Sequence, residues 1–285
     1  IRKMAKEKEN KVLNEIKSTG IGIYRDILRK KHPELSMPLR SLNNVKYDTK
    51  AGYFELLGKL KTRTLTASTV KTFAQTLKMM ALTKQLLEQD DIATKREAYY
   101  VSKNWGSAKF NEQMESDTVM DDIEAMMHVN REQLGFIPEE RGGDVAGNLI
   151  VIDIDPSTQK EIRIDCTKMG TGAYSIPVNV EHLKFETKAK FILAIETAGM
   201  FQRLVKHNYW QTANCILISM NGVPTRACRR FIRRLSDDIK IPVYGFVDGD
   251  PYAFGAIYRT LKVGSGNAAH INKFFLQSLV IDHIL

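Results

Sequence analysis

Residues 241–255 read IPVYGFVDGDPYAFG, and this stretch decides the fold of the surrounding sequence. The apolar run from Ile241 to Val247 predicts a buried strand, which is followed at once by Asp248 and Asp250. Side chains two residues apart on an extended chain point the same way, and paired carboxylates suit a hard divalent cation. The stretch therefore predicts a Mg²⁺ site at the carboxyl end of a strand.

Two further apolar runs lie upstream of this strand. One covers residues 190–195 and ends at Glu196, and the other covers residues 214–222; amphipathic stretches of helical length separate the three runs. Alternating strands and helices predict an α/β fold with a Rossmann-like, mainly parallel sheet, in which ligands bind beyond the carboxyl ends of the strands. We therefore expect Glu196 beside the Asp248 and Asp250 pair.

A second informative segment, residues 94–100, reads TKREAYY. Thr94 and Glu97 have the spacing of a capping box, so a helix should begin there. On that helix Tyr100 should lie opposite an apolar stripe and be exposed, whereas Tyr99 falls on the flank. The expected stripe consists of Ala98, Val101 and Trp105.

Two cations flank Tyr100 on this helix. Arg96 precedes it by four residues and Lys103 follows it by three, so both are expected on its face, where they could hold a phosphate and favour the phenolate. A phenol with a reference pKa of about 10 needs such help to attack at neutral pH.

Taken together, these motifs resemble a known family. A Glu that ends one strand and an Asp-x-Asp that ends another resemble the Toprim domain of topoisomerases, primases and some nucleases. The string VDGDPYAFG at residues 247–255 is similar to the family of topoisomerase VI A subunits and meiotic double-strand-break proteins. The segment from Arg96 to Tyr100 resembles that family's Arg-x-x-Tyr-Tyr, whose second tyrosine is the nucleophile.

The resemblance implies a DNA-cleaving subunit of an ATP-dependent type IIB topoisomerase. Tyr100 would form a transient 5′-phosphotyrosine link, with Arg96 as a catalytic and DNA-contacting residue. Mg²⁺ would be held by Asp248, Asp250 and Glu196, the last as ligand or general acid/base. The implied partners are double-stranded DNA and a GHKL-type ATPase B subunit, in an A2B2 heterotetramer built on a homodimer of this chain.

The resemblance also implies a domain order. Residues 1–66 would form an N-terminal arm and possible partner-binding region, with a helix stopped by Gly20. Residues 67–148 would form a winged-helix, CAP-like domain with three helices and the catalytic tyrosine, and residues 149–285 a Toprim domain. The family continues beyond the point corresponding to Phe275, so we expect the C-terminal end to be incomplete.

The Arg-rich segment at residues 225–235 reads TRACRRFIRRL and predicts a helix. Most of its arginines are expected on a solvated face. Arg226 opens the helix at the carboxyl edge of the sheet, so we expect it to contact DNA, together with Arg96 and Lys103.

Two other features have structural interpretations. Asp153 and Asp155 repeat the Asp-x-Asp-Pro pattern but lie between two alternating strands around a turn, so no metal is expected there. The predicted third helix, residues 116–128, carries four acidic residues and does not look like a groove reader.

Composition agrees with a polyanion partner without requiring one. The 285 residues carry a formal net charge of +9 and the pI is near 9.3. No apolar run approaches the roughly twenty residues that span a bilayer, and no phosphate-binding Gly-x-x-x-x-Gly-Lys-Ser/Thr occurs, so ATP would be used by the partner. We expect a cytoplasmic, nucleoid-associated protein in a prokaryote or a nuclear one in a eukaryote.

Three other interpretations remain open from the sequence. A meiotic-type protein would break DNA without strand passage. A Toprim nuclease or primase would use Mg²⁺ and Glu196 without a tyrosine adduct. A non-catalytic winged-helix protein would bind DNA unchanged by Tyr100→Phe.

Overall fold

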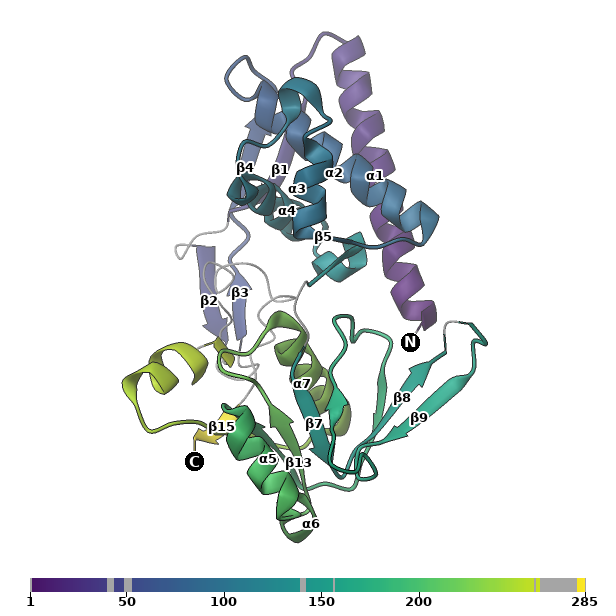
Figure 1. Ribbon diagram of the computed structural model, residues 1–285. Helices are drawn as coiled ribbons and strands as arrows, with labels where there is room; N and C mark the ends of the chain where they lie inside the picture. Colours follow the sequence, from purple (N-terminus) through teal and green to yellow (C-terminus); the bar gives the residue numbers. More distant parts are fainter. Residues whose placement is uncertain are drawn as a thin grey trace. The chain divides into compact units, whose positions relative to one another are not determined.

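The computed structural model describes residues 2–39, 44–48, 53–138, 142–155, 157–258, 260–261 and 281–284 (Figure 1). Over these ranges the chain is a mixed α/β protein that divides into two compact units. Residues up to 48 and 54–138 belong to the first unit, and residues 142–261 and 281–284 to the second. No helix in these ranges is both long and apolar enough to cross a membrane.

Helices dominate the N-terminal half of the chain. Its elements are, in order, α1 (Arg2–Leu28), β1 (Glu34–Pro38), β2 (Val45–Asp48), β3 (Tyr53–Leu56), β4 (Leu60–Thr64), α2 (Val70–Gln89), β5 (Ala93–Thr94), α3 (Lys95–Ser102), the 3-10 turn Gly106–Ala108, α4 (Gln113–Met127), the 3-10 turn Arg131–Leu134 and β6 (Phe136–Ile137).

The core of the first unit lies between α1, α2 and α4. Val12 and Ile16, which are four residues apart in α1, are buried against Met79 and Met80 of α2. The expectation that Gly20 stops this helix was wrong, because α1 runs on to Leu28. Ile23 continues the buried stripe two turns after Ile16, and its burial outweighs the cost of about 1 kcal/mol for a helical glycine.

The three helices expected after residue 66 are present as α2, α3 and α4. The extended segment after α4 is short: β6 has two residues and pairs in parallel with β5, which precedes α3. This pairing ties the start of α3 to the segment that follows α4. The described residues form no β-hairpin between α4 and residue 138, so the winged-helix assignment stays a prediction.

The acidic side chains of α4 have partners within the first unit. Glu124 is fully buried, and both of its oxygens accept hydrogen bonds from the Arg131 guanidinium, at 3.3 and 3.1 Å. Asp122 accepts one from Arg63 of β4 at 3.1 Å, and Asp117 pairs with Lys95 at 2.8 Å. These carboxylates therefore hold β4, α3 and the segment after α4 onto one helix.

The second unit is built around strands. Its elements are β7 (Asp144–Gly147), β8 (Ile150–Ile154), β9 (Glu161–Asp165), β10 (Tyr174–Ser175), β11 (Lys184–Glu186), β12 (Phe191–Ile195), α5 (Ala198–Lys206), α6 (Tyr209–Ala213), β13 (Cys215–Ser219), α7 (Arg226–Ile239), β14 (Val243–Phe246), the π-helical turn Ala253–Tyr258 and β15 (Ile281–Ile284).

A six-stranded sheet with the order β10-β7-β13-β12-β14-β15 forms the centre of this unit. The three strands expected from the sequence, β12, β13 and β14, are parallel neighbours, and β15 adds in parallel to β14. β7 and β10 pair antiparallel, so the sheet as a whole is mixed rather than uniformly parallel. β7 enters this sheet before residue 149, because it pairs with β13.

Helices cover both faces of the central strands, as the ribbon shows (Figure 1). Phe231 of α7 packs in one cluster with Ile192 and Ile216, whereas Phe201 of α5 packs in another with Leu193 and Leu217. Successive residues of a strand face opposite sides, so an uninterrupted apolar strand needs a cover on each. This explains why the strands read as continuous apolar runs.

The Asp-x-Asp-Pro repeat lies in a hairpin, as expected. β8 and β9 pair antiparallel on either side of the turn, and β11 completes a three-stranded sheet. Asp153 contacts His182 Nε2 at 2.9 Å. Asp155 accepts hydrogen bonds from the Ser157 hydroxyl and backbone N–H, and these bonds lower the pKa of Asp155 to about 2. Asp155 thus stabilises the turn of the hairpin, and Asp153 ties the hairpin to the segment before β11.

We expect Gly143→Ala to destabilise the second unit strongly. Gly143 has a φ of +98°, and a Cβ there would lie 2.0 Å from the carbonyl oxygen of Ser219 in β13. Left-handed strain and overpacking together should cost roughly 3–4 kcal/mol in urea unfolding. Gly222→Ala is the control, because Gly222 has a φ of +92° with open space around it and should cost only about 1–2 kcal/mol. Equal losses would contradict the clash.

We expect Arg131→Met to lower the free energy of unfolding of the first unit by about 3 kcal/mol, because it leaves the buried Glu124 carboxylate without its guanidinium. Arg163→Met is the control: Arg163 pairs with Glu186 on the surface, where both side chains are about half exposed, and its removal should change stability little. A similar effect of the two substitutions in thermal unfolding would show that burial of Glu124 is not what matters.

Candidate functional site

The helix that carries Tyr100 starts as the sequence predicts. The Thr94 hydroxyl accepts from the Glu97 backbone N–H at 3.1 Å, and the Glu97 carboxylate accepts from the Thr94 N–H at 2.5 Å. The cap is fixed further by the pairing of β5 with β6. The first turn of α3 is therefore fixed by the side-chain hydrogen bonds of the capping box and by the backbone pairing of the strand that precedes it.

Tyr100 is exposed and lies beside a cation, as expected. Its side chain has 53% of its surface exposed, and the Arg96 Nε donates a hydrogen bond to its hydroxyl oxygen at 3.3 Å. The Arg96 guanidinium carbon also lies 5.8 Å from the centre of the Tyr100 ring. A guanidinium suits a phosphate, so an anion bound by Arg96 would lie next to the Tyr100 hydroxyl.

The buried face of α3 differs from the expected stripe. Ala98 is fully buried, but Val101 is 41% exposed, and the second buried position is Ser102. Residues four apart lie more nearly on one face of a helix than residues three apart, so Ser102 follows Ala98 inward. Tyr100 still lies on the opposite, exposed side.

Lys103 does not lie on Tyr100, contrary to the expectation. Its ammonium donates to the Tyr99 hydroxyl at 2.8 Å and to the Phe110 carbonyl at 2.8 Å, and it lies 4.0 Å from the centre of the Tyr99 ring. Tyr99 and Lys103 are four residues apart, a spacing that allows this contact. The Phe110 carbonyl, which lies outside α3, favours it over a contact with Tyr100. Arg96 therefore contacts Tyr100, and Lys103 contacts Tyr99.

Glu196 and Asp248 come together at the carboxyl edge of the six-stranded sheet. Glu196 follows β12, and Asp248 follows the neighbouring parallel strand β14 after one residue. The Glu196 N–H donates to the Phe246 carbonyl at 2.9 Å, and the Asp248 N–H donates to a carboxylate oxygen of Glu196 at 2.8 Å. The parallel register therefore places these two acidic residues at one point of the edge.

Asp250 is directed into its own loop. One of its carboxylate oxygens accepts a hydrogen bond from the Ala253 N–H at 2.7 Å, at the start of the helical turn that follows β14. No three acidic, histidine or cysteine side chains among the described residues lie close enough to hold a metal ion. The donor chemistry nevertheless fits Mg²⁺, which takes oxygen ligands only and is usually held by one or two carboxylates plus water and phosphate.

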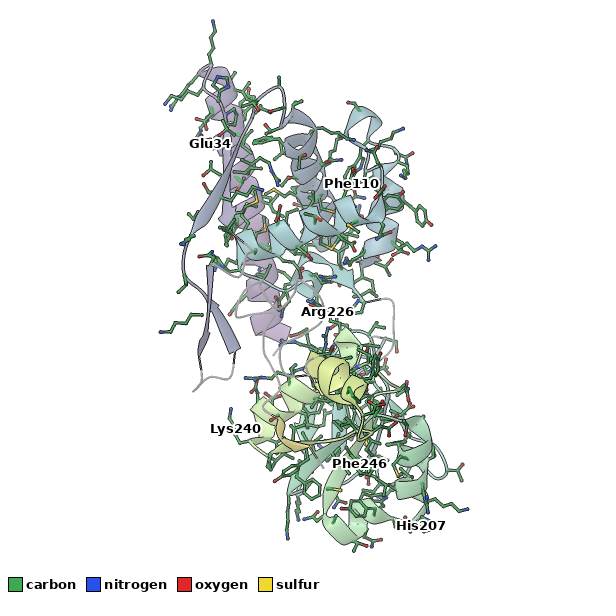
Figure 2. All side chains as sticks on the ribbon, turned by 90° about the vertical axis from the view of Figure 1, so that its left-hand side faces the viewer. Glu34, Phe110, His207, Arg226, Lys240 and Phe246 are labelled. Atoms are coloured by element: carbon green, nitrogen blue, oxygen red, sulfur yellow. The ribbon has the colours of Figure 1, made fainter. Side chains whose placement is uncertain are left out.

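Arg226 differs from the other arginines of α7. Arg230 pairs with Glu181, and Arg234 donates to the carbonyl of Leu183 at 2.8 Å, so these two fasten α7 to the segment before β11. Arg226, labelled in Figure 2, is half-buried and is the first residue of α7. The helix follows the loop after β13, whose carboxyl end lies beside that of the parallel strand β12, which precedes Glu196. The position of Arg226 fits a phosphate contact better than those of Arg230 and Arg234.

The three cysteines offer no rival nucleophile in the described part of the chain. Cys166, Cys215 and Cys228 are all buried, and burial raises the pKa of each thiol to about 12. Thiols in such surroundings stay protonated and inert at neutral pH.

The candidate functional residues therefore form two separate groups, one in each unit. Tyr100 and Arg96 lie in the first unit, and Glu196, Asp248, Asp250 and Arg226 lie in the second. A phenol next to a guanidinium can act as a nucleophile toward a phosphodiester, and oxygen donors at a sheet edge can hold the cation that such chemistry uses.

Family models match most of the chain. The model described as "Type IIB DNA topoisomerase" matches residues 71–136, and "All-beta domain in DNA topoisomerase VI alpha subunit" matches residues 139–189. The model for the Toprim domain of Spo11 and the topoisomerase 6 A subunit matches residues 191–279. The Toprim model thus begins at the first residue of β12, and a separate all-beta model covers the strands from β7 to β11.

Individual relatives give the same result. The chain is 55% identical over 249 residues to the A subunit of type 2 DNA topoisomerase 6 from Methanocaldococcus jannaschii, covering 87% of this chain and 67% of that protein. Proteins of the same name from Pyrococcus abyssi and Archaeoglobus fulgidus are 35% and 34% identical over 269 and 275 residues, covering 92% and 94% of this chain and 68% and 75% of those proteins. The chain belongs to the family of the A subunits of type 2 DNA topoisomerase 6, the DNA-cleaving subunits of the type IIB topoisomerases.

Proposed function

We propose that Tyr100 is the residue through which this chain cleaves DNA. The observation that carries the proposal is the exposed phenol whose oxygen accepts a hydrogen bond from Arg96. Tyr99 is a weaker candidate, because its hydroxyl already donates to the Asn111 carbonyl at 3.0 Å and accepts from Lys103. Family membership supports a reaction on the DNA backbone.

In the proposed reaction the Tyr100 oxygen attacks a backbone phosphorus. The new bond joins the tyrosine oxygen to phosphorus, and the bond from phosphorus to the 3′ oxygen breaks. The phenolic proton leaves to a base, and the 3′ oxygen takes up a proton to become a hydroxyl. One phosphodiester replaces another, so the strand can be resealed without an external energy source for that step.

Arg96 has two tasks in this scheme. Before attack, its hydrogen bond to the hydroxyl oxygen holds the Tyr100 side chain on the exposed side of α3. During attack, its planar guanidinium can also donate to the oxygens of the phosphate, whose negative charge is the natural partner for it. Arg226 would contact a neighbouring phosphate from the N-terminal end of α7, where the helix dipole also favours anions.

Glu196, Asp248 and Asp250 would hold Mg²⁺, with Glu196 as a ligand or a general acid/base. Bound there, the cation would supply charge neutralisation at the phosphate and the leaving oxygen. The second carboxylate oxygen of Asp250 would bind the cation while the first accepts from the Ala253 N–H, and the carboxylate of Glu196 already lies against the Asp248 backbone.

We further propose the assembly in which this reaction would serve topoisomerisation. Cutting both strands of double-stranded DNA needs two tyrosines, which a homodimer of this chain would provide. Passing a second duplex would need ATP hydrolysis by a GHKL-type B subunit, in an A2B2 heterotetramer. The relatives named above come from archaea, which supports work on the nucleoid in the cytoplasm.

We expect Tyr100→Phe to abolish covalent attachment to DNA, because it removes only the nucleophilic oxygen. The assay incubates the chain and its ATPase partner with end-labelled supercoiled DNA, Mg²⁺ and ATP, quenches with detergent, and detects protein-linked 5′ ends. Tyr99→Phe is the matched control: it keeps the nucleophilic oxygen and should still form the adduct, although at a reduced rate. An adduct that persists in Tyr100→Phe would overturn the assignment of the nucleophile. Free ends without an adduct would indicate a nuclease, and cleavage without relaxation of supercoils a break-forming protein.

We expect Asp248→Asn to slow adduct formation by roughly a hundredfold to a thousandfold, since charge stabilisation by a cation at this edge is worth several kcal/mol. Glu196→Gln should act in the same direction, and higher Mg²⁺ should partly restore both variants. Asp153→Asn, in the other Asp-x-Asp-Pro segment, is the control and should cleave like the unchanged chain. If Asp248→Asn also behaves like the unchanged chain at limiting Mg²⁺, the proposed metal site is wrong.

A further inference from the structure

A hydrogen-bond network separate from the Arg96–Tyr100 pair joins Tyr99 to the segment before α4. The Tyr99 hydroxyl donates to the Asn111 carbonyl at 3.0 Å, and Lys103 donates both to that hydroxyl and to the Phe110 carbonyl, each at 2.8 Å. Tyr99 of α3 and Lys103, its C-cap residue, are thus hydrogen-bonded to the consecutive residues Phe110 and Asn111. These bonds span the connection between α3 and α4.

The segment that Tyr99 and Lys103 contact, residues 109–111, is itself held in place by packing and hydrogen bonds. Phe110, labelled in Figure 2, is fully buried. Its ring centre lies 5.6 Å from that of Trp105. The Asn111 N–H donates to the Glu115 carboxylate of α4 at 2.8 Å, and the amide of Gln75 in α2 donates to the Lys109 carbonyl at 3.2 Å. The network therefore ties α3 to a fixed point in the core rather than to a loose loop.

Tyr99 is also the direct neighbour of the proposed nucleophile. The ring centres of Tyr99 and Tyr100 lie 5.5 Å apart at an interplanar angle of 51°, so a shift of one ring is felt by the other. Tyr100 is exposed, and the bond from Arg96 comes from the preceding turn of the same short helix. Neither feature fixes the direction in which α3 as a whole points.

We propose that Tyr99 and Lys103 are positioning residues, which lock α3 and thereby aim the Tyr100 oxygen at the scissile phosphorus. The inference rests on the proposed function of Tyr100. An attacking oxygen must be held close to its target and in line with the leaving oxygen, and a displacement of about 1 Å can cost about a hundredfold in rate. Lys103 acts through Tyr99 and the Phe110 carbonyl, and not as a contact to phosphate.

The test compares Tyr99→Phe, Lys103→Met and the double variant in the full complex with the ATPase partner. Single-turnover adduct formation is measured over a range of DNA concentrations. We expect the rate at saturating DNA to fall about tenfold in each single variant, with the half-saturating DNA concentration changed less than about twofold. The double variant should be no more than about twofold slower than either single one, because both substitutions break one network.

Four controls keep the result specific. Lys109→Met removes an exposed lysine from the same segment and should leave rate and half-saturation unchanged. Lys103→Arg retains a donor on the same side and should recover part of the rate. Thermal unfolding of each variant shows that the chains are folded, and mapping the adduct shows that Tyr100 remains the attached residue.

Distinct outcomes separate this inference from the proposed function. Failure of the unchanged complex to form an adduct would overturn both. An adduct in the unchanged complex, with Tyr99→Phe and Lys103→Met equally fast at saturation, would overturn the positioning role alone. A raised half-saturating concentration at an unchanged rate in Lys103→Met would show that Lys103 binds phosphate instead.

Discussion

The parallel register of β13, β12 and β14 is the constraint on which the second unit depends. Adjacent parallel strands end at the same edge, so Glu196, Asp248 and the loop that leads to Arg226 are gathered there by backbone hydrogen bonds. Burial of the central strands between α5 and α7 makes that register hard to shift, because a one-residue slip would turn apolar side chains from one cluster toward the other. The candidate metal edge is thus a consequence of the core.

Several arginines bind groups within their own unit, so their charges are not available to DNA. Arg63 and Arg131 neutralise acidic groups of α4, and Arg230 and Arg234 fasten α7 to the segment before β11. The paired arginines already cancel against their carboxylates in the formal net charge of +9, so the excess positive charge comes from other basic residues. Arg96 and Arg226 remain the strongest candidates for phosphate contact because of their places beside Tyr100 and at the sheet edge.

Local signals in the sequence predicted local structure well. The capping box at Thr94 and Glu97 is present because its two hydrogen bonds involve residues three apart and need no distant partner. The three central strands were also predictable, since each is a continuous apolar run. The errors at Gly20, Val101 and Lys103 share one cause: each depended on which neighbouring element would bury or bind the residue, and helical periodicity alone does not contain that information.

The sequence by itself determined the alternation of strands and helices in the Toprim segment, the start of the helix of Tyr100 and the family to which the chain belongs, because those features depend on residues close together in the chain. Tertiary structure alone decided the antiparallel addition of β7 and β10 and the engagement of Lys103 with Tyr99 and the Phe110 carbonyl. In each case the residues could make more than one local contact of similar energy. Only the packing of the whole unit selects the contact that forms.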